Sequence, residues 1–78
     1  MKDTLTYIVS AIVDSPDAVV IEEVEEEGVT NFIIHVAKED IGKVIGKEGK
    51  IIRSIRNVMK IPAMKSEARI HVTVAETE

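Results

Sequence analysis

The stretch of sequence that decides the fold is residues 41–56, which read IGKVIGKEGKIIRSIR. Its first apolar residues, Ile41, Val44 and Ile45, have helical spacing until Gly46 interrupts them. A second helical stripe begins after Gly49 and consists of Ile51, Ile52, Ile55, Val58 and Met59. The pattern therefore predicts two short helices that meet at a tight turn, residues 46–49.

This glycine-bracketed turn has the features of an anion-binding cradle. Gly46 and Gly49 remove side-chain bulk at both corners, so the backbone can adopt positive φ and approach a ligand closely. The first amides of the following helix lack intrahelical partners, and the helix dipole adds about half a positive charge there. The basic residues around the turn are Lys43, Lys47 and Lys50, with Arg53 one helical turn further on. A tight corner between two helices would also explain two glycines, without any ligand.

Charge is sharply segregated along the chain, whose net charge is −4. Residues 1–40 contain two basic and ten acidic residues, whereas residues 41–65 contain seven basic residues and the single acid Glu48. A local basic block of this kind attracts phosphate whatever the overall charge of the protein. A solvated helix face with incidental lysines is the alternative interpretation.

Length and composition restrict the class of protein. The 78 residues, 45% hydrophobic and 31% charged, predict one folded domain spanning residues 1–78. The absence of cysteine makes a reducing cytoplasm the expected location, and no apolar run is long enough to cross a membrane. Because Tyr7 and Phe32 are the only aromatic residues, nucleic acid would have to be recognised through backbone, aliphatic side chains and positive charge.

Outside the central stretch, the sequence predicts one further helix and three strands. The helical stripe runs from Leu5 to Val13, with Asp3 or Thr4 as its cap, and Pro16 stops it. The first strand is predicted over residues 18–24, with Val19 and Ile21 facing inward. The second is predicted over residues 30–37, with Phe32, Ile34 and Val36 facing inward. The third is predicted around Ile70, Val72 and Val74. Residues 25–28 read as a turn between the first two strands.

These strands alternate with a period of two, so the sheet should have one buried face that all helices share. We expect an α+β fold in the order α-β-β-α-α-β, with a three-stranded mixed sheet and three helices on one face. We also expect Pro62 to end or kink the last helix near Ile61, because proline has no amide donor.

Spacing excludes two other phosphate-binding motifs. A P-loop needs four residues between its first glycine and Gly-Lys, followed by Ser or Thr, whereas Gly42 and Gly46 enclose three residues and Glu48 follows Lys47. The dinucleotide fingerprint needs Gly-x-Gly-x-x-Gly directly after a strand, which is not the pattern here. A DNA-reading helix-turn-helix stays open, although Ile51 and Ile52 stand where polar base-reading residues should begin.

The run from Val44 to Ile52 resembles the signature of the KH domain, an (Ile/Val)-Ile-Gly-x-x-Gly-x-x-Ile core. The order of elements resembles the bacterial, type II version of this fold. Over nearly the whole chain, including the Asp14-x-Pro16-Asp17 stop and the run from Ala37 to Gly46, the sequence is similar to the small stand-alone bacterial KH proteins of the KhpA (YlqC) type.

The resemblance implies binding of single-stranded RNA, with the turn clamping the backbone of about four unpaired nucleotides beside an aliphatic groove. Gly46 and Gly49 would allow the close approach, Lys47 and the neighbouring amides would meet phosphate, and Gly42 would keep the first helix thin beside the groove. Ile45 and Ile52 would line the groove or belong to the core. The implied RNA-binding set is Gly42, Lys43, Ile45, Gly46, Lys47, Glu48, Gly49, Lys50, Ile52 and Arg53.

The family also implies a role as a post-transcriptional RNA chaperone, and a homodimer or a heterodimer with a larger Jag-type KH protein. Avidity through such pairing would compensate for the weak binding expected of one copy.

Two residues depart from the family pattern. Glu48 places a negative charge in the clamp, so it must point away or contact a base edge. Pro62 could alter a dimer surface built from its helix.

The remaining candidate residues predict no catalytic or metal site. His35 and His71 have no third ligand at metal spacing, and the serines have no evident His-Asp partners. We therefore expect no enzymatic activity, cofactor, metal or small-molecule substrate. The rival hypothesis is a KH-shaped protein-interaction module that has lost RNA binding, and Glu48 and the net acidity are its best support.

Overall fold

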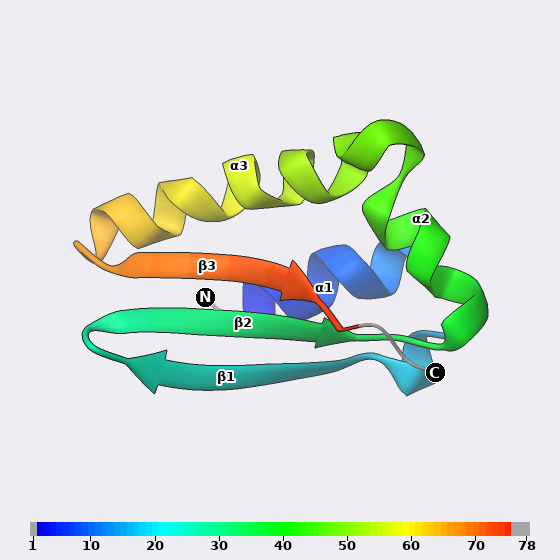
Figure 1. Cartoon of the computed structure of the whole chain (residues 1–78), viewed down its shortest axis with the longest axis horizontal. Coiled ribbons are helices and arrows are strands. Elements are labelled where there is room, and N and C mark those ends of the chain that lie inside the picture. Colours follow the sequence, from blue (N-terminus) through cyan, green and yellow to red (C-terminus); the bar gives the residue numbers. More distant parts are fainter. Residues whose placement is uncertain (1, 76–78) are drawn as a thin grey trace.

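The computed structural model describes residues 2–75 as three α-helices on a three-stranded sheet (Figure 1). The elements in chain order are α1 (Lys2–Ile12), η1 (Pro16–Ala18), β1 (Val20–Glu26), β2 (Val29–His35), η2 (Lys38–Asp40), α2 (Ile41–Ile45), η3 (Lys47–Gly49), α3 (Lys50–Lys65) and β3 (Arg69–Val74). The sheet order is β1-β2-β3, with β1 antiparallel and β3 parallel to the central β2. The predicted α+β class, element order and mixed sheet are confirmed.

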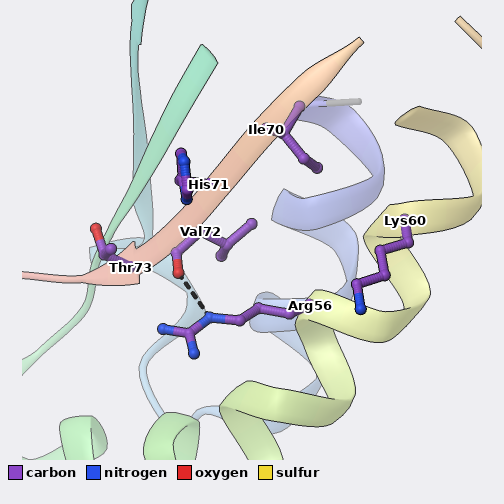
Figure 2. A pocket seen from close by; sticks show the side chains of 6 residues that line it. All are labelled: Arg56, Lys60, Ile70, His71, Val72 and Thr73. Carbon is purple, nitrogen blue, oxygen red and sulfur yellow. Dashed lines mark hydrogen bonds between the residues drawn. The ribbon is translucent and has the colours of Figure 1, made fainter. Parts of the chain in front are cut away.

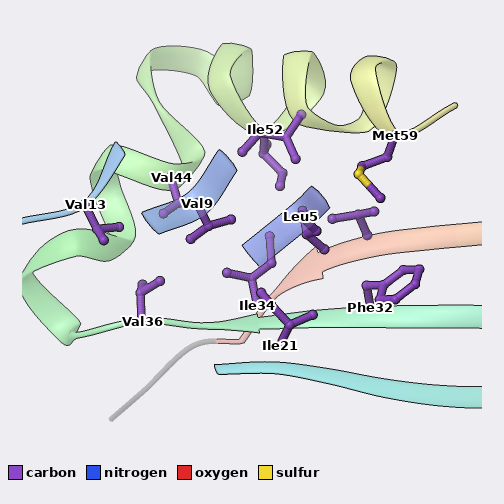
Figure 3. Packing of buried hydrophobic residues seen from close by; sticks show 12 residues of the cluster. Leu5, Val9, Val13, Ile21, Phe32, Ile34, Val36, Val44, Ile52 and Met59 are labelled. Carbon is purple, nitrogen blue, oxygen red and sulfur yellow. The ribbon is translucent and has the colours of Figure 1, made fainter. Parts of the chain in front are cut away.

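The hydrophobic core lies between the sheet and the helices (Figure 3). On β2, Phe32 and Ile34 are fully buried, whereas the alternate residues are only half-buried. The buried side chains that face them from the helices are Leu5 and Val9 of α1, Val44 of α2, and Ile52, Ile55 and Met59 of α3. All three helices therefore cover the same face of the sheet, as the period-two alternation predicts.

The first helix follows the predicted stripe but begins earlier than expected. Leu5 and Val9 are buried, and the helix ends at Ile12, ahead of Pro16. Because α1 begins at Lys2, Asp3 and Thr4 lie inside its first turn, and the prediction that one of them caps the helix is wrong. Asp3 still complements the positive end of the helix dipole from that position.

The β1–β2 hairpin places its turn later than the sequence predicts. Glu25 and Glu26 belong to β1 and pair with Thr30 and Val29, so the turn is reduced to Glu27 and Gly28. Both turn residues have positive φ, as a two-residue hairpin turn that matches strand twist requires. Ile21 faces the core as predicted, and Val19 packs partly against the core from just before β1.

The prediction that Pro62 ends the last helix near Ile61 is wrong, because α3 continues through it to Lys65. The alternative, a kink at Pro62, stays a prediction. Proline removes only the hydrogen bond that its own amide would make to the Val58 carbonyl, and Val58 lies on the exposed side of the helix. Met59 and Ala63, on either side of the proline, are buried against the core side of the helix. This packing offsets the local cost of the proline.

Candidate nucleic-acid interface

The turn between α2 and α3 has a backbone that only glycine can supply at its first corner. Gly46 has φ 77° and ψ 175°, a region reserved for glycine. A Cβ added there would lie 2.5 Å from Cγ1 and 2.8 Å from Cβ of Ile51, well inside ordinary contact distance. The main chain therefore passes directly over Ile51 and has no room for a side chain at Gly46.

The rest of the turn bends through two successive left-handed residues. Glu48 has φ 58° and ψ 25°, Gly49 has φ 72° and ψ 17°, and the amide of Gly49 donates to the Gly46 carbonyl over 3.2 Å. A non-glycine residue in this conformation costs about 1–2 kcal/mol, so Glu48 is strained. Lys47 and Glu48 are exposed at the tip. The turn is thus open to solvent in a single chain.

The Arg53 side chain forms hydrogen bonds to the backbone of the turn. Its Nη2 donates to the Glu48 carbonyl over 2.6 Å, and its Nε donates to the Gly49 carbonyl over 3.4 Å. The sequence predicts Arg53 as a mobile charge one helical turn beyond the cradle. The structure instead attaches its guanidinium to the carbonyls of the two left-handed residues, where it helps to fix the shape of the turn while keeping positive charge beside it.

Lys43, on α2, forms ion pairs with two acidic residues. Its Nζ donates to Oδ2 of Asp14 and lies 3.8 Å from Oδ1 of Asp40. The hydrogen bond to Asp14 raises the pKa of Lys43, and the negative charges of Asp14 and Asp40 add to this effect. Although Lys43 belongs to the predicted basic set, its charge is largely neutralised by these two acids.

Asp40 is a residue that sequence reasoning missed. It is fully buried, and its carboxylate accepts hydrogen bonds from the amides of Asp14 (3.3 Å) and Ser15 (3.0 Å). These bonds tie the segment after α1 to the residue that precedes α2. The one sequence signal was the spacing of Asp40 and Lys43, three residues apart at the start of a helix.

The free positive charge at the turn comes from Lys47 and Lys50. Both are exposed, and neither has an acidic partner within 4.0 Å among residues 2–75. Gly42 is exposed on α2, and a Cβ added there would meet no protein atom within 4 Å. The bare surface at Gly42 therefore serves no packing contact within the described chain.

The two aliphatic residues of the predicted set lie in different environments. Ile52 is only 7% exposed and belongs to the core cluster, whereas Ile45 is half-buried and packs against that cluster from the end of α2. Of the two interpretations that the sequence leaves open, core residue or groove wall, the structure favours core for Ile52. Ile45 keeps a surface that a ligand could touch.

A pocket of about 400 Å³ opens between α3 and the β3 edge (Figure 2). It is lined by Arg56, Lys60, Ile70, His71, Val72 and Thr73. Arg56 Nε donates to the Val72 carbonyl over 2.9 Å. Arg56 and Lys60 belong to the basic block but were not predicted as site residues, although their positions three and seven residues after Arg53 place them on its helix face.

The two histidines do not form a pair. His35 Nε2 lies 3.0 Å from Glu22 Oε1 on the neighbouring strand, while His71 is opposite Asn31 in the β2–β3 register. Position 31 and His35 are four residues apart along β2, a distance of about 13 Å. Within residues 2–75 no group of three or more histidine, cysteine or acidic side chains could hold a metal ion.

Hydropathy and helix length also bear on membrane insertion. Among the helices of the part of the chain that the structure describes, none combines the length and apolar character needed to span a bilayer.

Comparison with known proteins places the chain in a family. A family model described as "KhpA/KhpB, KH domain" matches residues 2–74. Among curated relatives, an RNA-binding protein KhpA of Clostridium acetobutylicum is 43% identical over 74 residues, which cover 95% of this chain and 99% of the relative. An RNA-binding protein KhpA of Chlamydia caviae is 40% identical over 76 residues and 97% of each chain.

A more distant relative has the same name. The RNA-binding protein KhpA of Treponema pallidum is 35% identical over 75 residues, which cover 96% of this chain and 94% of the relative. The search of solved structures found no match. The family is not enzymatic, which agrees with the expectation from the sequence. The α-β-β-α-α-β order with a mixed sheet is consistent with a type II KH-like fold. The chain therefore belongs to the KhpA/KhpB family of KH domains.

Proposed function

We propose that this protein binds single-stranded RNA, with residues 46–49 clamping the sugar-phosphate backbone of about four nucleotides. The observation that carries the proposal is the shape of the turn, in which Gly46 and Gly49, both half-buried and without side chains, flank the exposed Lys47 and Glu48 at the start of a 16-residue helix. The names of the relatives, all RNA-binding proteins, support RNA as the ligand.

The electrostatics of the turn support a phosphate partner. Lys47 and Lys50 have exposed side chains beside the opening turn of α3, where the helix dipole contributes partial positive charge. The acidic residues that give the chain its net charge of −4 lie mostly before residue 41, and five of them lie on β1 and its turn. A phosphate strand at residues 46–49 therefore meets a local positive field.

Single-stranded RNA fits the turn better than a duplex does. The KH mode of recognition uses unpaired nucleotides whose bases can leave the stack. Ile45 offers an aliphatic surface beside the turn. Neither α2 nor α3, the helices that flank the turn, carries an aromatic residue, and Phe32 is fully buried in the core. One copy should therefore bind weakly, and the clamp itself should read little sequence.

Pairing of two KH domains would raise this affinity, and α3 offers a surface for it. The exposed apolar residues of α3 are Ile51, Val58, Ile61 and Met64, with Ile61 61% and Met64 76% exposed. Ile51, Val58 and Ile61 recur at seven and three residues, as in a helix-pairing stripe. We propose a second copy of this chain as the occupant. The alternative, suggested by the family resemblance, is a larger Jag-type KH protein.

Three further features belong to the proposal. The family resemblance implies the role of a post-transcriptional RNA chaperone, the absence of cysteine favours the cytoplasm, and length and composition favour a single domain that spans residues 1–78. None of them is used in the argument for RNA binding at the turn.

The proposal is tested by titrating a labelled single-stranded RNA with the wild-type protein and with Lys47→Asp. The matched control is Lys2→Asp, which makes the same change in net charge on α1, away from the turn. Lys47→Asp should weaken binding at least tenfold, and the control should change it less than about twofold, with thermal melting of Lys47→Asp unchanged. If about four phosphates are engaged, log K should fall with log salt with a slope near −3.

Equal binding by wild type and Lys47→Asp, or no binding by either at low salt, would contradict the clamp. Absence of binding would favour the rival function, a KH-shaped protein-interaction module, for which the exposed stripe of α3 is the specific supporting observation. A preference for duplex DNA in direct competition would favour the helix-turn-helix interpretation instead.

A further inference from the structure

One lysine of the basic block is paired with acids of its own chain, whereas the lysines at the turn are free. Lys43 contacts Asp14 and Asp40, while Lys47 and Lys50 have no acidic partner within 4.0 Å among residues 2–75. We propose that Asp14 competes with RNA phosphate for Lys43, so that this internal ion pair lowers the affinity of the protein for RNA. The inference rests on the proposed RNA binding and concerns the regulation of that same site.

The two acids that pair with Lys43 lie in different environments. The side chain of Asp40 is 1% exposed, and its carboxylate accepts the amides of Asp14 and Ser15 over 3.3 and 3.0 Å. The side chain of Asp14 is 76% exposed, and within residues 2–75 the only partner of its carboxylate is Lys43 Nζ. Asp40 is therefore a fixed part of the fold, and Asp14 is the partner that can be exchanged.

Exchange of Asp14 for a phosphate is favourable on electrostatic grounds. An ion pair between exposed side chains is weak, because water and salt screen both charges. An RNA strand presents a row of phosphates, so it competes well with a single exposed carboxylate. When a phosphate takes the place of Asp14, Lys43 Nζ can keep its position 3.8 Å from Oδ1 of the buried Asp40. The exchange therefore leaves no buried charge without its cation.

Lys43 is close enough to the turn to meet the same RNA strand. It precedes Gly46 by three residues, about 4.5 Å along the axis of α2. The Gly46 amide donates to the Gly42 carbonyl over 2.8 Å, so the turn is attached to the end of this helix. Gly42 itself is exposed and carries no side chain that would obstruct a strand on α2. A strand of about four nucleotides is longer than this distance.

The competition has a signature in the salt dependence of binding. A free lysine that meets a phosphate releases a counterion from the RNA, which steepens the fall of log K with log salt by about 0.7 for a single strand. In the wild type, the Asp14 carboxylate must leave Lys43 at the same time and is then neutralised by cations from solution, which offsets that release. Removing the Asp14 charge should therefore raise the affinity and steepen the slope together.

The test titrates a labelled single-stranded RNA, at several salt concentrations, with wild type, Asp14→Asn, Lys43→Gln and the double variant. Asp14→Asn should bind about two- to fivefold more tightly than wild type, the range that corresponds to a surface ion pair, with a slope steeper by about 0.7. The double variant should bind no more tightly than Lys43→Gln. The matched control is Asp17→Asn, the same charge change at a residue without an ion pair among residues 2–75, and it should change binding less than about 1.5-fold.

A second measurement uses the wild type alone, so it does not depend on the folding of any variant. During titration with RNA at constant pH, the carboxyl-carbon NMR signal of Asp14 should shift and saturate together with the amides of the turn, while that of Asp17 stays in place.

Three results would overturn the inference: no gain in Asp14→Asn beyond that of Asp17→Asn, a gain that persists in the Lys43→Gln background, or an Asp14 signal unchanged at saturation. In each case, loss of binding in Lys47→Asp would still uphold the clamp. No binding by wild type or any variant at low salt would overturn both proposals.

Discussion

Replacing Gly46 with alanine puts the geometry of the turn to a quantitative test. The added Cβ would lie 2.5 Å from Ile51 Cγ1, and the backbone would have to keep φ near 77° with ψ near 175°. A residue strained in this region costs about 1–3 kcal/mol, and relief of the overlap by shifting Ile51 costs about 1–3 kcal/mol more. Gly46→Ala should therefore lose about 2–6 kcal/mol of the roughly 4–12 kcal/mol expected for the unfolding of a 78-residue domain.

Urea unfolding and thermal melting measure this loss. At about 4–8 °C per kcal/mol for a domain of this size, the melting temperature should fall by about 8 °C or more. The matched control is Gly42→Ala, the same substitution four residues earlier, where an added Cβ meets no atom within 4 Å. In a helix this control should gain up to about 1 kcal/mol, because alanine has the higher helix propensity. Equal melting temperatures for the two variants would refute the geometry deduced for Gly46.

Three further predictions concern residues around the turn. Asp40→Asn should cost about 1–3 kcal/mol in urea unfolding, because it weakens the buried acceptor of the Asp14 and Ser15 amides; a loss below about 0.5 kcal/mol would contradict that role. Glu48→Gly should raise stability by about 1 kcal/mol by relieving the left-handed strain, and should also tighten RNA binding by removing a negative charge; lower stability would show that the strain is absent. The raised pKa of Lys43 means that its ion pair stabilises the fold fully below about pH 10.4, the unfolded value, and is lost as the pH rises through the folded value. Thermal melting followed from pH 9 to 12 should therefore fall more steeply for wild type than for Asp14→Asn, and parallel curves would contradict the pairing.

The fold could be predicted from the sequence because each element carries a local pattern. The period-two alternation around Phe32 and Ile34 and the helical spacing of Leu5 and Val9 are both found in the core with the predicted orientation. Pro62 shows where local rules fail. Its effect on the helix depended on burial of Met59 and Ala63, which is a property of packing that no single position reveals.

The candidate site was predictable in its backbone but not in its side-chain partners. The two glycines mark the turn locally: the conformation of Gly46 and its contact with Ile51 exclude other residues, and Gly49 adopts the left-handed region that glycine favours. The ion pair between Lys43 and Asp14 joins residues 29 apart in sequence, and the bond from Arg56 to Val72 joins residues 16 apart. Such contacts follow from how α2 and α3 dock on the sheet. Charge counting along the chain therefore placed Lys43 with the free lysines, although its charge is paired.

The central claim is that an RNA strand lies against the turn at residues 46–49, and amide NMR spectra recorded during titration with single-stranded RNA test it most directly. The account predicts that the largest shifts occur at residues 46–50 and saturate together, with smaller shifts at the α3–β3 pocket. Shifts confined to the exposed apolar stripe of α3 or to the uncovered face of the sheet, with residues 46–50 unchanged at saturation, would contradict it.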